Sequence, residues 1–354
     1  MGWIMSQKLV LCLMAAKLFL CLTAASVIAG GGKSELVGRA AYVRPFGENA
    51  PWNVPVAELR RHPNSQELVR RLWFEGSDRP GNFNLNFDEY TYPVYEAADA
   101  SGLFEVRTAR RKPLNGHKIP WNPTWNPAPG TDAQAIIIDQ KTGTEWDLWK
   151  VVFDGKFIHA RNASRIPGDY RKREVGFVPS RGAGIPYLAM LVRGQEVLEG
   201  EIRHALTLTV VNSDGFLFVP PATKVEHPRT HRDGIPAGTR YALDISDLEI
   251  EQWIRTLPNE LTKEAKRSAR TIARALRDYG CFVVDSSGVT KMQFESRLTA
   301  GAIWDQVGLA RMQIGWKAYP RDLLDGLFTP DRLYAIVPSD QYPSHRLARF
   351  PAPD

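Results

Sequence analysis

AIIIDQKTGTEWDLWKVVF, residues 135–153, is the stretch on which the expected fold depends. An apolar run, Ala135–Ile138, meets a turn at residues 139–143, and a second run with the composition of a strand follows. Asp139 suits the start of a turn because its carboxylate can accept from nearby backbone N–H groups, and Gly143 tolerates a positive φ. The stretch therefore predicts a β-hairpin.

Side chains on a strand alternate between its two faces, so the second run carries two different surfaces. One face is predicted to hold Glu145, Asp147, Trp149 and Val151, and the other Trp146, Leu148, Lys150 and Val152. Two carboxylates beside an indole are typical of a sugar-binding cleft. An ordinary solvated strand has the same appearance, and the pattern does not separate the two.

The chain has 354 residues, of which 44% are hydrophobic, and a formal net charge of +6. This is enough apolar material for one large domain. Arginine is spread along the sequence and not clustered, which speaks against a nucleic-acid partner and favours, at most, an anionic one. A basic exported protein with no charged ligand explains the charge equally well.

Residues 1–29 have the pattern of a signal peptide. Lys8 precedes an apolar stretch, Leu9–Ala29, and three glycines follow, with cleavage expected before Gly30. Lys17 interrupts the apolar run, so no stable membrane insertion is expected after cleavage. We therefore expect a secreted or periplasmic protein. Its mature chain, 30–354, would keep only Cys281, which excludes an internal disulfide and a zinc site built on cysteines.

The remaining sequence indicates a single mainly β (α+β) domain, 30–354, with an extended arm at its start, near Phe46 and Trp52. Alternation over residues 82–88 and 202–211 predicts further strands. Amphipathic helices are expected at 65–75, 247–257 and 262–279, the last with an apolar stripe at helical spacing and Gly280 after it. No linker or repeat divides the mature chain.

Aromatic residues gather in two segments that suit a carbohydrate surface, because rings cover the C–H faces of sugars. Tyr90 and Tyr92 follow the alternating segment, and Trp121 and Trp125 lie in a proline-rich loop, 112–130. The alternatives are a half-buried edge strand for the tyrosines and packing against proline for at least one tryptophan.

Hydrolysis of a glycosidic bond needs two carboxyl groups that flank it. Glu145 and Asp147, roughly 7 Å apart along a strand, resemble the strand motif of jelly-roll glucanases, which implies a jelly-roll-like β-sandwich with a few peripheral helices. Where that motif would place a second glutamate, this chain has Trp149. Asp88, Glu89 or Asp285 would have to supply the missing acid.

A polysaccharide lyase is the second hypothesis, because it needs a cation to neutralise a uronate and a Tyr, His or Lys base. Arg203 and His204, with Tyr90 or Tyr92, are the candidates. Adjacent residues on a strand point to opposite faces, so Arg203 and His204 enter one cleft only at a bulge. A lone histidine on an apolar face is more often a satisfied core group.

The segments NFDEYTYPVY, EWDLW, GEIRHAL and ALRDYGCFVVD are similar to a recurrent group of exported bacterial proteins to which no activity is attached. The leading hypothesis is an exported glycoside hydrolase that acts on a polysaccharide or oligosaccharide. Glu145, Asp147, Asp88 and His204 are its candidate catalytic residues. Tyr90, Tyr92, Trp121, Trp125, Trp149 and Arg203 are its candidate substrate-binding residues. No cofactor and no metal ion are expected, and a glycan-binding protein without catalysis is the third alternative.

Overall fold

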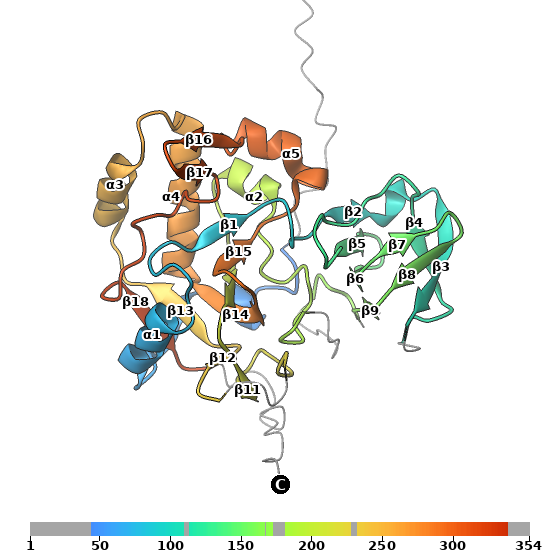
Figure 1. Cartoon of the computed structure of the whole chain (residues 1–354), viewed down its shortest axis with the longest axis horizontal. Helices are drawn as coiled ribbons and strands as arrows, with labels where there is room; N and C mark the ends of the chain where they lie inside the picture. Colours follow the sequence, from blue (N-terminus) through green and yellow to red (C-terminus); the bar gives the residue numbers. More distant parts are fainter. Residues whose placement is uncertain (1–43, 110–112, 167, 173–180, 228–231, 339–354) are drawn as a thin grey trace, which may run out of the picture. The chain divides into compact units, whose positions relative to one another are not determined.

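The computed structural model describes residues 44–109, 113–166, 168–172, 181–227 and 232–338, all within one compact unit, Tyr42–Asp354. The fold is mainly β with a few helices (Figure 1). The expected signal peptide, residues 1–29, lies outside the described residues.

A six-stranded mixed sheet forms the larger part. Its strand order is β1 (Asn84–Asn86), β15 (Lys291–Gln293), β10 (Leu206–Val210), β14 (Cys281–Ser286), β13 (Arg240–Leu243) and β18 (Leu333–Ile336). Strands β1 and β15 are parallel, β10 and β14 are parallel, and β10 meets β15 in the antiparallel sense. The first residue of β15 therefore lies beside the end of β10, and the two meet near the end of β14.

The helices bury their apolar faces in the same hydrophobic core that the six-stranded sheet lines. They are α1 (Ser65–Phe74), α2 (Gly194–Glu199), α3 (Asp247–Thr256), α4 (Lys263–Asp278) and α5 (Arg297–Gln306). The predicted stripe of α4 is confirmed, since Ala265, Ala269, Ile272 and Leu276 are all buried. Thr262 begins α4 by accepting from the N–H of Ala265, as an N-cap residue does.

Residues 94–165 supply two four-stranded sheets. One has the order β2 (Val94–Glu96), β5 (Ala135–Asp139), β6 (Thr144–Trp149) and β9 (Asn162–Arg165), and the other β4 (Lys118–Trp121), β3 (Gly102–Thr108), β8 (Phe157–Ala160) and β7 (Val152–Phe153). They enclose a core of their own around Ile137, Leu148 and Ile158.

The hairpin predicted from residues 135–153 is confirmed as β5 and β6. Asp139 accepts from the backbone N–H of Lys141 at 2.9 Å and from the hydroxyl of Thr142 at 2.7 Å. Gly143 has a φ of 63°, a conformation that L side chains avoid. The turn chemistry read from the sequence therefore sets this connection.

Two pairs of short strands complete the fold: β11 (Ser213–Phe218) with β12 (Ile235–Ala237), and β16 (Met312–Ile314) with β17 (Lys317–Tyr319). Three 3₁₀ turns are η1 (Pro51–Asn53), η2 (Val56–Glu58) and η3 (Ala97–Asp99). In the segment expected to be an extended arm, Phe46 and Trp52 are buried and meet edge to face at 5.2 Å between ring centres.

The strand expected over residues 202–211 is shorter than predicted, because β10 begins only at Leu206. Arg203 and His204 therefore precede the strand, and the argument from alternating faces does not apply to them. Among the described residues, none of the helices has the length and apolar character that crossing a membrane requires.

Candidate functional site

Four residues form a row across neighbouring strands of the large sheet. Asn84 of β1 pairs with Lys291 of β15, Lys291 with Thr209 of β10, and Thr209 with Asp285 of β14. Directly paired residues project from the same face of a sheet, and neighbouring strands are about 4.8 Å apart. Asp285 and Lys291 are therefore roughly 10 Å apart, two strand spacings, on one face.

Three pockets follow this row, and they share lining residues. The distal pocket, about 590 Å³, is lined by Asn84 to Tyr90, Val289, Lys291, Arg311, Met312, Gln313 and Ala318 to Arg321. The middle pocket, about 440 Å³, is lined by Tyr90, Asp132, Gln134, Thr209, Asp285 to Val289, Lys291 and Gln293. The acid pocket, about 380 Å³, is lined by Asp132, Gln134, Trp149, Arg161, Asn162, Arg181, Gly182, Tyr187, Lys224, Glu226, His227, Asp285 and Ser286.

The shared residues make the three pockets neighbours in a line. Tyr90 and Lys291 belong to both the distal and the middle pocket. Asp132 and Asp285 belong to both the middle and the acid pocket. The arrangement suits a ligand with several units in a row better than a single compact molecule.

The acid pocket contains two carboxyl groups in contact, those of Asp285 and Glu226. Burial raises the pKa of Asp285 well above its usual range, and the charge and hydrogen bond of Glu226 raise it further. Oε2 of Glu226 also accepts from the N–H of Ser286 at 2.5 Å, and His227 lies 3.2 Å from Oε1. One proton shared by the pair therefore makes Asp285 a candidate proton donor.

Gly182 allows this pair to approach the backbone. A Cβ at this position would stand 2.4 Å from Oδ1 of Asp285 and 2.6 Å from Cγ of Glu226. Both carboxylic side chains thus pack directly on the Gly182 backbone, which holds them together.

Asp132 brings a third carboxylate to the pocket from the segment before β5. Its Oδ1 accepts from the indole N–H of Trp149 at 3.1 Å, which orients the carboxylate. Its negative charge contributes to the raised pKa of Asp285, so the two carboxyl groups lie close enough to interact electrostatically. Trp149 lines the pocket, and Arg161 lies 5.3 Å from its ring centre.

Arg181 is a buried cation beside these acids, with only 1% of its surface exposed. It donates to the carbonyl oxygens of Ala189 at 2.7 Å and Tyr187 at 2.5 Å, and to the hydroxyl of Tyr92 at 3.3 Å. Its charge opposes the rise in the pKa of Asp285. Since these bonds fix the guanidinium, it acts as a stationary positive charge.

Glu145 and Asp147 share one face of β6, as the alternation predicted, but that face is covered. They are 0% and 2% exposed, and the N–H groups of Leu188 and Tyr187 donate to them at 2.9 and 3.0 Å. Burial, then the charge and hydrogen bond of Asp147, raise the pKa of Glu145 well above its usual value. Neither residue lines the three pockets, so their catalytic role stays a prediction that this burial does not support.

The four aromatic residues predicted to bind sugar fall in different surroundings. Tyr90 is half-buried and lines two of the pockets, whereas Tyr92 is fully buried and stacks on Tyr187 at 4.4 Å. Trp121 and Trp125 are 0% and 9% exposed and meet edge to face at 5.6 Å. Their contacts place these two rings in the core of the smaller sheets.

The remaining candidates are separated from one another. His204 is buried, 3.1 Å from Oε2 of Glu196, whereas Arg203 is exposed and pairs with Glu201 at 2.7 Å. Asp88 lines the distal pocket and forms an ion pair with Arg311. The structure does not bring His204 to Asp88 or to the acids of β6.

Sequence reasoning named Asp285 only as one possible supplier of a missing acid, and it missed Glu226, Asp132, Arg181 and Lys291. One usable signal was present: Asp285 ends the apolar run CFVVD, the position at which a strand presents polar groups at the edge of its sheet. Glu226, Asp132 and Arg181 come from segments between strands, whose positions periodicity does not reveal, and Lys291 begins the three-residue strand β15, which is too short to show a period.

Within the described parts of the chain, no group of three or more His, Cys, Asp or Glu side chains has the geometry to hold a metal ion. Comparison of the sequence and the structure with known protein families, characterised proteins and solved structures gave no match.

Proposed function

We propose that the protein is an exported polysaccharide-active hydrolase, with its reaction centre in the acid pocket. The proposal keeps the reaction class expected from the sequence and assigns it to different acids. The observation that carries it is the Asp285–Glu226 pair, which faces Asp132 and Trp149 in a line of three connected pockets. Export, with cleavage before Gly30, and a jelly-roll-like arrangement of the sheets remain parts of the proposal that rest on sequence alone.

Asp285 suits the role of general acid, because its raised pKa favours the protonated form. It would donate this proton to the glycosidic oxygen as the bond to the anomeric carbon breaks. Glu226 is in hydrogen-bond contact with Asp285 and cannot flank the bond as its partner, since the two acids of glycosidases are about 5 Å or more apart.

Asp132 is the carboxylate that can complete the reaction. The Trp149 N–H holds it in place, and it lies in the same pocket as Asp285. It would either attack the anomeric carbon or direct a water molecule to it. In both routes water supplies the hydroxyl to the anomeric carbon, and the proton that water loses balances the one that Asp285 gave to the departing oxygen.

Two buried glutamine side chains favour a ligand that carries hydroxyl groups. Gln134 and Gln293 are 5% and 3% exposed, line the middle pocket, and each has a side-chain oxygen without a hydrogen-bond partner among the described residues. An unmatched buried acceptor costs about 1–3 kcal/mol. A sugar hydroxyl that donates to it would remove this cost.

A lyase is the second candidate, and Lys291 beside Tyr90 favours it. The Lys291 ammonium lies 4.8 Å from the Tyr90 ring centre in the middle pocket. In this route Lys291 would neutralise a uronate carboxylate, and Tyr90, in its phenolate form, would take the C5 proton. The C4–O bond would then break as a C4–C5 double bond forms, and the departing oxygen would receive the proton that Tyr90 took.

Product analysis with a panel of neutral and acidic polysaccharides tests the proposal. New reducing ends alone indicate a hydrolase, reducing ends with the absorbance of an unsaturated uronate indicate a lyase, and retention without cleavage indicates a binding protein. For the hydrolase, Asp285→Asn and Asp132→Asn should each lower turnover at least a hundredfold. The matched control is Asp331→Asn, an exposed aspartate outside the three pockets, which should leave turnover unchanged. Full activity in both pocket variants would refute the assignment.

A further inference from the structure

Lys291 is a buried cation whose ammonium contacts no carboxylate among the described residues. Only 8% of its surface is exposed, yet among the described residues its Nζ takes part in no hydrogen bond or ion pair. The ammonium lies over the face of the Tyr90 ring, and the backbone N–H of Lys291 donates to Oγ1 of Thr209. Burial lowers the pKa of Lys291, while the charges of Asp285, Asp132 and Glu89 act in the opposite direction without contacting the ammonium.

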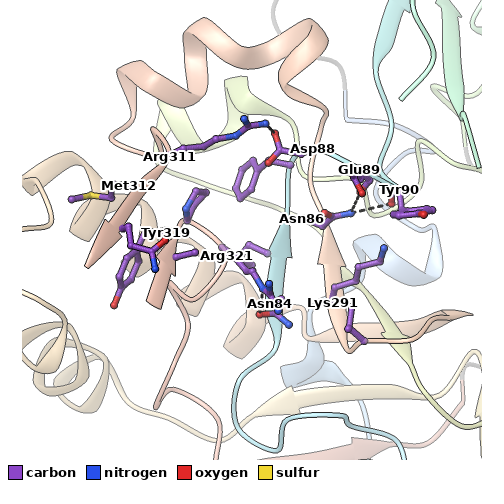
Figure 2. Close-up of a pocket in the computed structure, with 16 residues that line it drawn as sticks. Asn84, Asn86, Asp88, Glu89, Tyr90, Lys291, Arg311, Met312, Tyr319 and Arg321 are labelled. Atoms are coloured by element: carbon purple, nitrogen blue, oxygen red, sulfur yellow. Dashed lines mark hydrogen bonds and ion pairs between the residues drawn. The ribbon is translucent and has the colours of Figure 1, made fainter. Parts of the chain in front are cut away.

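The ammonium is placed where two pockets meet. Lys291 lines both the distal and the middle pocket, and Figure 2 shows its side chain rising from β15 toward Tyr90. A Cβ on Gly130 would stand 2.9 to 3.1 Å from three atoms of the Tyr90 ring, so backbone covers a face of this ring. Tyr90 is thus held in place, and its ring contacts the Lys291 ammonium more than it offers a stacking surface to a sugar.

A second cation lies in the distal pocket with unused donors. Arg321 donates from Nε to Oδ1 of Asn84 at 3.1 Å, and Nη1 and Nη2 have no partner among the described residues. Asn84 itself pairs with Lys291 across β1 and β15. Arg311, the third cation here, is already paired with Asp88 (Figure 2). Of these three cations, Lys291 and Arg321 are therefore the ones available to bind a negatively charged group of a ligand.

We propose that the junction of the distal and middle pockets binds a sugar oxyanion, with Lys291 as its main ligand and Arg321 as its second. The substrate class is then an acidic polysaccharide. A uronate carboxylate at this junction would lie about two strand spacings, roughly 10 Å, along the groove from Asp285. The inference rests on the proposed function for its polymer, but its anion site rests on the positions of Lys291 and Arg321.

Binding of the mature chain to matched oligosaccharides tests this. The probes are a uronate oligosaccharide, the same oligosaccharide after reduction of its carboxyl groups, and a neutral oligosaccharide that carries sulfate esters, each titrated by calorimetry at low and at moderate salt. The uronate oligosaccharide should bind more tightly than its reduced form, and salt should weaken only the charged complexes. Tighter binding of the sulfated probe than of the uronate would assign the oxyanion to a sulfate ester.

Lys291→Met keeps most of the side-chain volume and removes the charge. It should weaken binding of the acidic oligosaccharide by about tenfold to a hundredfold, the range for hydrogen bonds to charged groups, and leave binding of the reduced form unchanged. Lys291→Arg should restore part of the affinity. The matched control is Lys156→Met, because Lys156 also lies over an aromatic ring, at 5.0 Å from Phe157, but is exposed and outside the pockets.

Equal affinity for the acidic and reduced oligosaccharides, no binding of either, or an unchanged affinity in a folded Lys291→Met variant would overturn the anion site. Failure of the two proposals can be told apart. Binding through Lys291 without cleavage of any polymer refutes the hydrolase and keeps the site. Cleavage of a neutral polymer that Lys291→Met does not alter keeps the hydrolase and refutes the site.

Discussion

Arg181 and Glu145 are joined through one peptide group, that between Tyr187 and Leu188. Arg181 donates to the Tyr187 carbonyl oxygen at 2.5 Å, and the Leu188 N–H at the other end of the same group donates to Oε1 of Glu145 at 2.9 Å. The Arg181 charge lowers the pKa of both Glu145 and Asp285 against the effect of burial. The charge of one buried arginine thus acts on two pairs of acids, one in the core and one in a pocket.

Arg181→Met should strongly destabilise the protein. The substitution leaves two buried carbonyl oxygens without their donor and removes the positive charge between the acid pairs. Breaking a buried charge arrangement in this way typically costs about 3–5 kcal/mol. Urea unfolding at pH 7 measures the change. Arg274→Met is the control, since Arg274 is paired with Asp247 at the surface and should change stability by about 0.5 kcal/mol or less. A loss below about 1 kcal/mol for Arg181→Met would contradict this account.

The pair of Glu145 and Asp147 should make stability depend on pH. The folded pKa of Glu145 lies above its unfolded value, so the folded state binds the shared proton more tightly than the unfolded chain does. This contribution to stability is fully present below about pH 4.5, the unfolded value, and is lost as pH rises through the folded pKa. Asp285 contributes with the same sign.

Glu145→Gln removes that titration and keeps an oxygen for the Leu188 N–H. Its free energy of unfolding, relative to the wild type, should therefore improve as pH rises above about 4.5 and through the folded pKa of Glu145. Urea unfolding at several pH values measures the difference, with Asp331→Asn as the control that follows the wild-type curve. A constant difference over this range would show that Glu145 titrates as an ordinary exposed carboxyl group.

Glu226→Gln should shift the pH dependence of turnover. The proposed acid, Asp285, is active when protonated, so activity falls as pH rises through its pKa. Glu226 raises that pKa by its charge and hydrogen bond, and a neutral glutamine should lower it. The alkaline limb of kcat against pH should then move to lower pH, with turnover kept on the acidic side. An unmoved alkaline limb would separate Glu226 from the proton on Asp285.

The sequence was sufficient where a local pattern decides the structure. The period of α4 and the turn residues Asp139 and Gly143 are complete within short segments, and both elements form as predicted. The common face of Glu145 and Asp147 on β6 was also right, because alternation along a strand is a local property.

The groups that cover that face come from distant positions in the sequence. Leu188 comes 43 residues after Glu145, and its backbone N–H satisfies a carboxylate that sequence alone presents as free. The pairing of Asp285 with Glu226, 59 residues before it, likewise depends on how a loop packs on Gly182. Two acids at a spacing that suits a cleft therefore belong to the core. Of the acids in the pocket, Asp285 ends an apolar run that predicts a strand, whereas Glu226 and Asp132 come from segments without a recognisable pattern.

Trp149→Phe tests whether the N–H that orients Asp132 matters for the reaction. Phenylalanine keeps an aromatic ring in the acid pocket but removes the indole N–H that donates to Oδ1 of Asp132 at 3.1 Å. Without it the carboxylate is free to rotate away from the substrate, so kcat should fall by about tenfold, the lower end for a hydrogen bond to a charged group, while KM changes little. Trp149→Ala should raise KM as well, because it also removes the ring.

Steady-state kinetics on the cleaved polymer separate the two effects, and Trp316→Phe is the matched control, because Trp316 is 72% exposed and lines none of the three pockets. If Trp149→Phe raised KM and left kcat intact, Trp149 would bind the sugar without orienting Asp132. The opposing carboxylate of the reaction would then have to be sought elsewhere in the groove.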